Sequence, residues 1–137
     1  MAETQTAKHS NHPVLPSSGS GREALRVKGQ FWTPPWLAKA MAAWVTAARP
    51  HLLFDPAVGP GTFFAAAREI GFKGDFAGFE LDHAVLLAAY KLGLTPEELA
   101  GIRIGDFIQN HIDGLYPAII SNPPYIRHHR LGAQQKR

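Results

Sequence analysis

The sequence predicts an α/β domain built on a doubly wound, mostly parallel sheet of about four strands. Two observations support this fold class. Short apolar runs alternate along the chain with segments of helical periodicity, which is the order that builds parallel sheets through helical crossovers. Each apolar run also ends on polar residues, and ligands of such sheets bind beyond the carboxyl ends of the strands. We therefore expect a binding site along one edge of the sheet.

The composition predicts one compact domain preceded by a polar segment. The chain has 137 residues, of which 45% are hydrophobic and 18% charged, as in an ordinary globular domain. Residues 1–28 are rich in Ser, Gly and Pro and are expected to form a flexible leader, with the folded domain at 29–137. No apolar run approaches the ~20 residues of a membrane-spanning helix. The chain has no cysteine, and its seven histidines show no zinc-ligand spacing, so no metal site is expected.

The first helix is expected to begin at Thr33, whose hydroxyl can cap it, with Pro34 in the first turn. Apolar residues then recur at helical spacing as far as Ala48, so that one face should pack on the sheet. Trp36 and Trp44 belong to this pattern. They are predicted to be core residues and not a platform for a ligand.

The remaining elements follow in regular alternation. Strands are expected at residues 51–54, 75–79, 102–104 and 117–121. Helices are expected at residues 62–70, at residues 84–92, and from Thr95, where a capping hydroxyl is followed by Pro96 and two acids in the first turn.

Three of the strand ends carry residues suited to a nucleoside. Gly59-Pro60-Gly61 lets the backbone pass close to a ligand, although Phe64 replaces the third glycine of the dinucleotide fingerprint and a plain tight turn is the alternative. Glu80 follows Asp55 by 25 positions, near the offset at which an acid binds a ribose diol. An exposed acid at a strand end is the alternative there. Asp106-Phe107 could accept a hydrogen bond from an amino group and cover a ring face.

The fourth strand ends in the segment Asn122-Pro123-Pro124-Tyr125, which is the most informative part of the chain. The two prolines fix φ and contribute no N–H, so the carbonyls of the turn remain free to accept hydrogen bonds. Asn122 and a neighbouring carbonyl would form a pair of acceptors for an amino group, and Tyr125 offers a flat face for stacking. A plain turn with a half-buried tyrosine is the alternative.

The net charge of +3 is concentrated after this turn. The basic residues at 126–137 are Arg127, Arg130, Lys136 and Arg137, and this segment has no acid. A basic strip beside a base-stacking site suggests contact with a phosphate backbone. A polar tail is the alternative.

Together, these motifs resemble those of class I S-adenosylmethionine-dependent methyltransferases. The chain is most similar to the amino-terminal portion of the N6-adenine DNA methyltransferases of restriction–modification systems. The resemblance extends from residue 29 to about residue 130 and is most specific at 54–63 and 122–125, while Gln30–Pro34 resembles the upstream cofactor motif. It implies a cytoplasmic enzyme with a Rossmann-like methyltransferase sheet. A complete sheet of this family has seven strands, so about four would make it incomplete.

The resemblance also implies roles for individual residues. The residues that would surround the methionine part of S-adenosyl-L-methionine are Phe31, Thr33, Pro34, Asp55, Pro56, Ala57, Gly59 and Gly61. Glu80 would hold the ribose hydroxyls, and Asp106 and Phe107 would position the adenine of the cofactor. Val58 stands where many relatives carry a cysteine, which is a packing change.

In the implied reaction, the target is an adenine flipped out of double-stranded DNA. Asn122 and the Pro123 carbonyl, held by the rigid Pro123-Pro124 pair, would accept hydrogen bonds from the N6 amino group, while Tyr125 would stack on the base. Accepting from both N–H groups makes the nitrogen more pyramidal and its lone pair available. Because the sulfonium methyl group is already activated, the main remaining task is in-line placement.

Two alternatives to adenine methylation remain open. Related families use a similar turn to methylate a protein glutamine or an RNA base. The chain could also be a non-catalytic fragment that only binds cofactor. In the preferred interpretation, a missing carboxyl-terminal recognition region or a complementary chain supplies most contacts to DNA.

Overall fold

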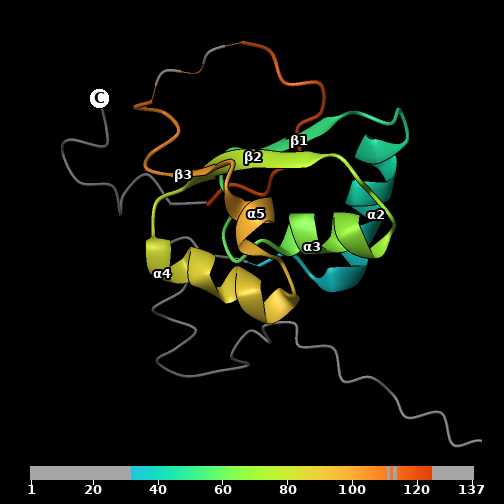
Figure 1. Cartoon of the computed structure of the whole chain (residues 1–137), viewed down its shortest axis with the longest axis horizontal. Helices are drawn as coiled ribbons and strands as arrows, with labels where there is room; N and C mark the ends of the chain where they lie inside the picture. Colours follow the sequence, from blue (N-terminus) through green and yellow to red (C-terminus); the bar gives the residue numbers. More distant parts are fainter. Residues whose placement is uncertain (1–31, 111, 113, 125–137) are drawn as a thin grey trace, which may run out of the picture.

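The protein is described by a computed structural model that covers residues 32–110, 112 and 114–124 (Figure 1). Three parallel strands form its sheet: β1 (Leu52–Asp55), β2 (Asp75–Glu80) and β3 (Ile102–Ile104), in the order β1-β2-β3. On the other edge of β1, a single parallel bridge pairs Phe54 with Ile119. The chain therefore passes from β1 outward to β3 and then returns across the sheet to the far side of β1.

The helices lie together on one side of the sheet (Figure 1). They are α2 (Pro35–Thr46), α3 (Thr62–Glu69), α4 (His83–Leu86), the 3-10 helix η1 (Leu87–Leu92) and α5 (Pro96–Leu99). Right-handed crossovers explain this placement, because two successive steps in the same direction, from β1 to β2 and from β2 to β3, put both connections on one face. The return step runs in the opposite direction, so its connection crosses the opposite face.

The core lies between these helices and the sheet. Ring stacking joins α3 to β2, since the Phe64 and Phe76 centroids are 4.4 Å apart. Leu53 of β1 is fully buried in the same cluster. Ala38 and Ala42 are the buried residues of α2, and their small side chains let this helix pack closely on α3.

A cluster of aromatic rings covers the opposite face of the sheet. Because side chains alternate along a strand, Phe54 and Phe79 point away from the helices. Tyr116 stacks on Phe54 with ring centroids 3.7 Å apart, and Phe107 lies 6.0 Å from Phe54 and 5.8 Å from Phe79. The connection between β3 and Ile119 thus covers this face with two rings.

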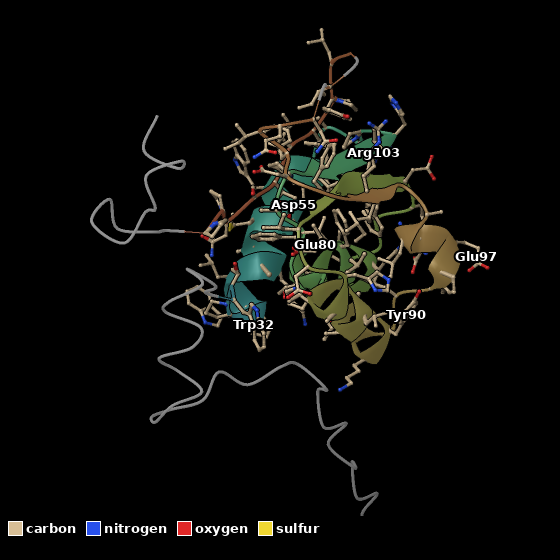
Figure 2. All side chains as sticks on the ribbon, turned by 90° about the vertical axis from the view of Figure 1, so that its left-hand side faces the viewer. Trp32, Asp55, Glu80, Tyr90, Glu97 and Arg103 are labelled. Atoms are coloured by element: carbon tan, nitrogen blue, oxygen red, sulfur yellow. The ribbon has the colours of Figure 1, made fainter. Side chains whose placement is uncertain are left out.

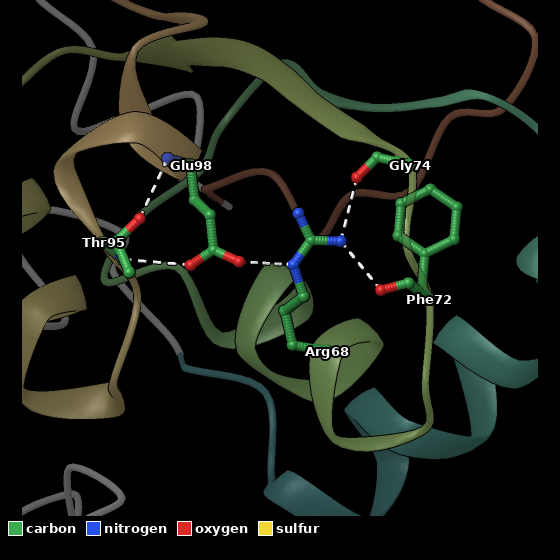
Figure 3. Close-up of polar contacts among 5 residues, drawn as sticks. All are labelled: Arg68, Phe72, Gly74, Thr95 and Glu98. Carbon is green, nitrogen blue, oxygen red and sulfur yellow. Dashed lines mark hydrogen bonds and ion pairs between the residues drawn. The ribbon is translucent and has the colours of Figure 1, made fainter.

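A polar clamp joins α3 to α5 (Figure 3). Arg68 of α3 pairs with Glu98, and its Nη1 donates to the Phe72 and Gly74 carbonyls, each at 2.8 Å. Glu98 also belongs to a capping box with Thr95. The predicted cap at Thr95 is confirmed.

Most predicted elements agree with the structure. The parallel α/β class is confirmed, as an incomplete Rossmann-like sheet, and the first three strands agree within one residue at each end. The predicted strand at 117–121 is reduced to a single bridge. Pro117 and Pro123 bound this segment, and proline cannot donate to a ladder. The predicted helix at 84–92 divides into α4 and η1.

Two predictions about the first helix are wrong. Pro34 is its N-cap and no side chain caps it, because the fixed φ of Pro35 suits the first helical position and leaves Thr33 outside the helix. Trp36 and Trp44 are 71% and 83% exposed. Each lies two positions from a buried alanine of α2, and two positions along a helix lead to nearly the opposite face.

The leader predicted at residues 1–28 lies outside the described residues. None of the helices in the described part of the chain has the length and apolar character needed to cross a membrane. The residues at 32–110, 112 and 114–124 contain no group of three or more His, Cys, Asp or Glu side chains that could hold a metal ion.

Candidate functional site

The ends of neighbouring strands meet at one edge of the sheet, which faces the viewer in Figure 2. Asp55 is the last residue of β1 and Glu80 the last of β2, and the two lie close together in this view. Asn122 follows the segment that is bridged to the other edge of β1. The order of strands reverses here, at β1, and such switch points are where open α/β sheets bind ligands.

A glycine loop connects β1 to α3 and is tied to the end of β2. The Gly59 N–H donates to Glu80 Oε2 at 2.7 Å, and the Val58 N–H donates to the Phe79 carbonyl at 2.9 Å. Gly59 and Gly61 have φ of 59° and 79°, in the left-handed region that favours glycine. A Cβ at Gly61 would also lie 2.8 Å from Leu94 Cδ1. The loop is therefore fixed at both ends and closely packed where α3 begins.

Glu80 is buried and each of its carboxylate oxygens is occupied. It is 9% exposed, Oε2 accepts from Gly59, and Oε1 accepts from the Asp82 N–H at 2.8 Å. The alternative of an exposed acid is therefore wrong. Each carboxylate oxygen can accept a second hydrogen bond, so Glu80 can orient the loop and still receive hydroxyl donors.

Asp55 is the most deeply buried acid of the site, at 1% exposure. Its Oδ1 accepts from the Ala57 N–H at 2.9 Å. Burial raises the pKa of Asp55 to about 7; the Ala57 N–H and the Ser121 hydroxyl oppose the rise, and the charge of Glu80 adds to it. Ser121 Oγ is buried and has no hydrogen bond of ordinary geometry within the described residues, so it acts on Asp55 as a nearby dipole.

The fourth strand end is joined to the segment before α2. Asn122 Nδ2 donates to Thr33 Oγ1 at 3.1 Å, across 89 positions of sequence. Two backbone hydrogen bonds of 2.9 Å, which Phe54 makes with Ala118 and Ile120, align the preceding residues along β1. Asn122 is half-buried, and Pro123 after it is exposed. The turn thus begins at a fixed point and then leads to the surface.

Asp106 and Phe107 stand just after β3. Asp106 Oδ1 accepts from the Ile108 N–H at 2.9 Å, which fixes its side chain against its own turn. Phe107 is half-buried in the aromatic cluster with Phe54 and Phe79. Its ring is therefore held in place by the sheet, with part of its surface exposed.

The structure places most of the predicted site residues at the carboxyl-terminal edge of the sheet, and two of them are not described. Phe31 and Tyr125 are outside the described residues. Sequence reasoning missed the contact of Ser121 with Asp55 and the bond between Thr33 and Asn122. The sequence did contain a signal for Ser121, because this serine comes directly before the turn. The last residue of a segment parallel to β1 lies beside the last residue of β1, which is Asp55.

An apolar groove adjoins the site. It has a volume of about 440 Å³ and lies between α2 and the segment bridged to β1. Its lining residues are Ala40, Met41, Trp44, Val45, Ile119, Ile120 and Ser121. The exposed Trp44 therefore forms one wall of a concave surface.

Known proteins resemble this chain over most of its length. A sequence model of the family described as N-6 DNA Methylase matches residues 20–137. The type II methyltransferase M.XamI of Xanthomonas campestris pv. amaranthicola is 30% identical over 121 residues, which cover 85% of this chain and 23% of that protein. M.HincII of Haemophilus influenzae is 26% identical, with 80% and 19% covered, and M.AccI of Acinetobacter calcoaceticus is 32% identical, with 73% and 18% covered.

The chain spans about a fifth of the length of these relatives. The family match nevertheless includes every strand, the glycine loop and the turn at Asn122. With this match over residues 20–137 and a parallel sheet whose strand ends converge at β1, the chain belongs to the N-6 DNA methylase family.

Proposed function

We propose that this chain forms the cofactor-binding and catalytic part of an adenine-specific DNA methyltransferase of a restriction–modification system. The enzyme transfers a methyl group from S-adenosyl-L-methionine to N6 of adenine. The convergence of Asp55, Glu80 and Asn122 at one edge of the sheet carries this proposal. The printed names of the relatives, type II methyltransferases, support the reaction class.

The chemistry of the site fits the proposed cofactor, which supplies an activated methyl group when bound. Asp55 is buried, and within the described part of the chain no cationic side chain pairs with it. A positive charge nearby would favour its ionised form, and both the sulfonium and the amino group of the cofactor are positive. Glu80 retains capacity for hydroxyl donors after its two backbone bonds.

We propose the same cofactor-binding residues that the resemblance implies. Those near the methionine part are Phe31, Thr33, Pro34, Asp55, Pro56, Ala57, Gly59 and Gly61. Glu80 accepts from the ribose hydroxyls. Asp106 and Phe107 hold the adenine of the cofactor. Phe107 is partly exposed, which supports its role in covering the adenine ring.

The turn at 122–125 acts on the target base. Asn122 and the Pro123 carbonyl accept from the two N6 hydrogens, which draws the nitrogen out of conjugation with the ring. Pro124 keeps the turn rigid, and Tyr125 stacks on a base flipped out of the duplex. This chemistry needs acceptors and placement but no strong base, because the amine loses its proton after the methyl group has arrived.

A further part of the enzyme reads the DNA sequence. The relatives are several times longer than this chain, and base-specific contacts require side chains that reach into a groove. We infer that a carboxyl-terminal recognition region, in the same polypeptide or in a complementary chain, supplies them. The enzyme works in the cytoplasm, where its DNA substrate is found.

Methyl transfer from labelled cofactor to duplex DNA tests this function. The full chain is assayed alone and together with the remainder of M.XamI, from which the segment that matches this chain has been removed, as a separate polypeptide. The expected product is N6-methyladenine, identified in the digested DNA. Asn122→Ala should lower the rate by about 100-fold or more, as loss of one positioned polar group in an active site does, whereas Gln109→Ala, at an exposed amide, should not change it.

Three results would contradict the proposal. Label in RNA or in a protein glutamine, but not in DNA, would assign the site to another substrate. Cofactor binding without transfer under either condition would indicate a non-catalytic fragment. An Asn122→Ala variant that is as active as the wild type would remove the turn from the mechanism.

A further inference from the structure

The hydrogen bond between Thr33 and Asn122 joins two segments with separate expected roles. Thr33 belongs to the upstream segment expected to contact the cofactor, and Asn122 to the turn expected to hold the target base. Asn122 Nδ2 lies 3.1 Å from Thr33 Oγ1. Thr33 is 8% exposed, and its hydroxyl does not cap α2. The hydroxyl is therefore turned inward, toward the turn.

The orientation of the Asn122 carboxamide decides whether it can accept from an amino group. A carboxamide has a donor arm, the NH2 group, and an acceptor arm, the oxygen. If the amide were reversed, its NH2 would face the N–H groups of the target, and two donors would repel each other. In the structure the NH2 arm donates to Thr33, so the oxygen arm points away from Thr33.

We propose that Thr33 is a positioning residue that holds the Asn122 carboxamide with its acceptor oxygen toward the target amino group. This inference rests on the proposed function, because it assumes that Asn122 binds that group. It extends the role of Thr33 beyond the cofactor. The upstream segment then supports the catalytic turn directly, and a buried hydroxyl links the two halves of the site.

Three variants separate positioning from cofactor contact. Thr33→Val keeps the shape and removes the hydroxyl, and Thr33→Ser keeps the hydroxyl. Thr46→Val makes the same change in α2, where the Thr46 hydroxyl donates to the Ala42 carbonyl of its own helix. A neutral hydrogen bond contributes about 1 kcal/mol, or roughly five-fold in a rate. We expect Thr33→Val to lower kcat by about five-fold at saturating cofactor, where a change in the Kd for S-adenosyl-L-methionine no longer affects the rate.

The matched variants complete the kinetic test. Thr33→Ser and Thr46→Val should keep kcat within about two-fold of the wild type. In an Asn122→Ala background, Thr33→Val should have no further effect, because the two residues act as one unit. A kcat that is unchanged in Thr33→Val, or a loss that appears only in the Kd for cofactor, would overturn the positioning role. Additive losses in the double variant would overturn it as well.

A measurement without turnover tests the contact itself. The side-chain NH2 protons of Asn122, observed by ¹⁵N-edited NMR of the full chain, should shift and exchange faster with water in Thr33→Val than in Thr46→Val. Unchanged signals would overturn the inference even if the enzyme is active. The signals could change in Thr33→Val while the wild-type chain shows no methylation of DNA. That result would overturn the proposed function, and with it the catalytic role of the bond.

Discussion

Two carboxylates of this molecule, Glu98 and Asp55, stand in opposite surroundings. Burial would raise the pKa of Glu98, but hydrogen bonds from Arg68 and the Thr95 N–H, together with the charge of Arg68, hold that pKa below its usual value. Burial raises the pKa of Asp55 to about 7, because only an N–H and a hydroxyl oppose it and Glu80 adds a like charge. The ionised form of Glu98 is stabilised by its neighbours, whereas the ionised form of Asp55 is destabilised by burial.

The surroundings of Glu98 serve the fold. Arg68 contacts Glu98 and two carbonyls of the turn before β2 (Figure 3). Its guanidinium carbon also lies 4.2 Å from the ring centroid of Phe76. These contacts fasten α3, β2 and α5 together. Nothing in this arrangement calls for a ligand, because the charge of each partner is met by the other.

The surroundings of Asp55 serve a site. A buried acid with a raised pKa and a second acid beside it costs stability, and such groups concentrate where ligands bind or react. The difference between the two acids suggests that the clamp stabilises the fold and that the buried acids at the strand ends destabilise it. The following predictions test this division, beginning with the largest effect.

Asp55→Asn should make stability less dependent on pH. The pKa of Asp55 is raised on folding, from 3.8 to about 7. The contribution of Asp55 to the free energy of unfolding is therefore fully present below pH 4 and is lost as the pH rises through 7. The free energy of unfolding of the wild type should therefore fall relative to Asp55→Asn by on the order of 4 kcal/mol between these pH values. Urea unfolding at several pH values measures the difference.

The control for Asp55→Asn is Asp75→Asn, at an exposed acid at the start of β2. This variant makes the same change from acid to amide outside the site, so it measures the effect of that change by itself. A constant difference between wild type and Asp55→Asn across the range would show that Asp55 is not destabilised, and the contrast with Glu98 would disappear.

Arg68→Ala should lower the free energy of unfolding by about 3 kcal/mol, because it removes hydrogen bonds to a charged partner and leaves Glu98 unpaired. The loss should shrink at low pH: the stabilising charge of Glu98 is present above its ordinary pKa of 4.5 and disappears as the pH falls through its lowered value. Chemical denaturation at pH 7 and pH 3 measures both effects.

Lys39→Ala is the matched control for the clamp and the smallest expected effect. Lys39 pairs with Glu69, but the two side chains are 45% and 41% exposed. Exposed pairs contribute about 0–1 kcal/mol, so this variant should unfold almost like the wild type. Equal losses in Lys39→Ala and Arg68→Ala would mean that burial and the carbonyl contacts of Arg68 add nothing.

Local signals made much of the fold predictable. The apolar runs predicted the strands of the parallel sheet, and the helix start at Thr95, with its capping hydroxyl, proline and two acids, was visible in four residues. The face of α2 was not predictable in the same way, because alanines and tryptophans alternate around it and both count as apolar. Only packing on α3 shows that Ala38 is buried while Trp36 is exposed.

The positions of the polar residues at the strand ends were predictable one by one, but the bonds that connect them were not. Each strand end showed its polar residue in the sequence, since the position depends on a local change from apolar to polar. The bond from Asn122 to Thr33 and the one from Gly59 to Glu80 span 89 and 21 positions, and no local pattern specifies such pairs. They depend on the fold, which places Asn122 beside Thr33 and the end of β2 beside the glycine loop.

Calorimetric titration of the full chain with S-adenosyl-L-methionine near pH 7 tests the central claim most directly. We expect a Kd in the micromolar range, on the order of common substrate affinities. Proton release on binding, measured in buffers of different ionisation enthalpy, should be present in the wild type and absent in Asp55→Asn, because a bound positive charge lowers the pKa of Asp55. No heat at millimolar cofactor, or the same proton release in both proteins, would contradict the assignment of these strand ends to the cofactor.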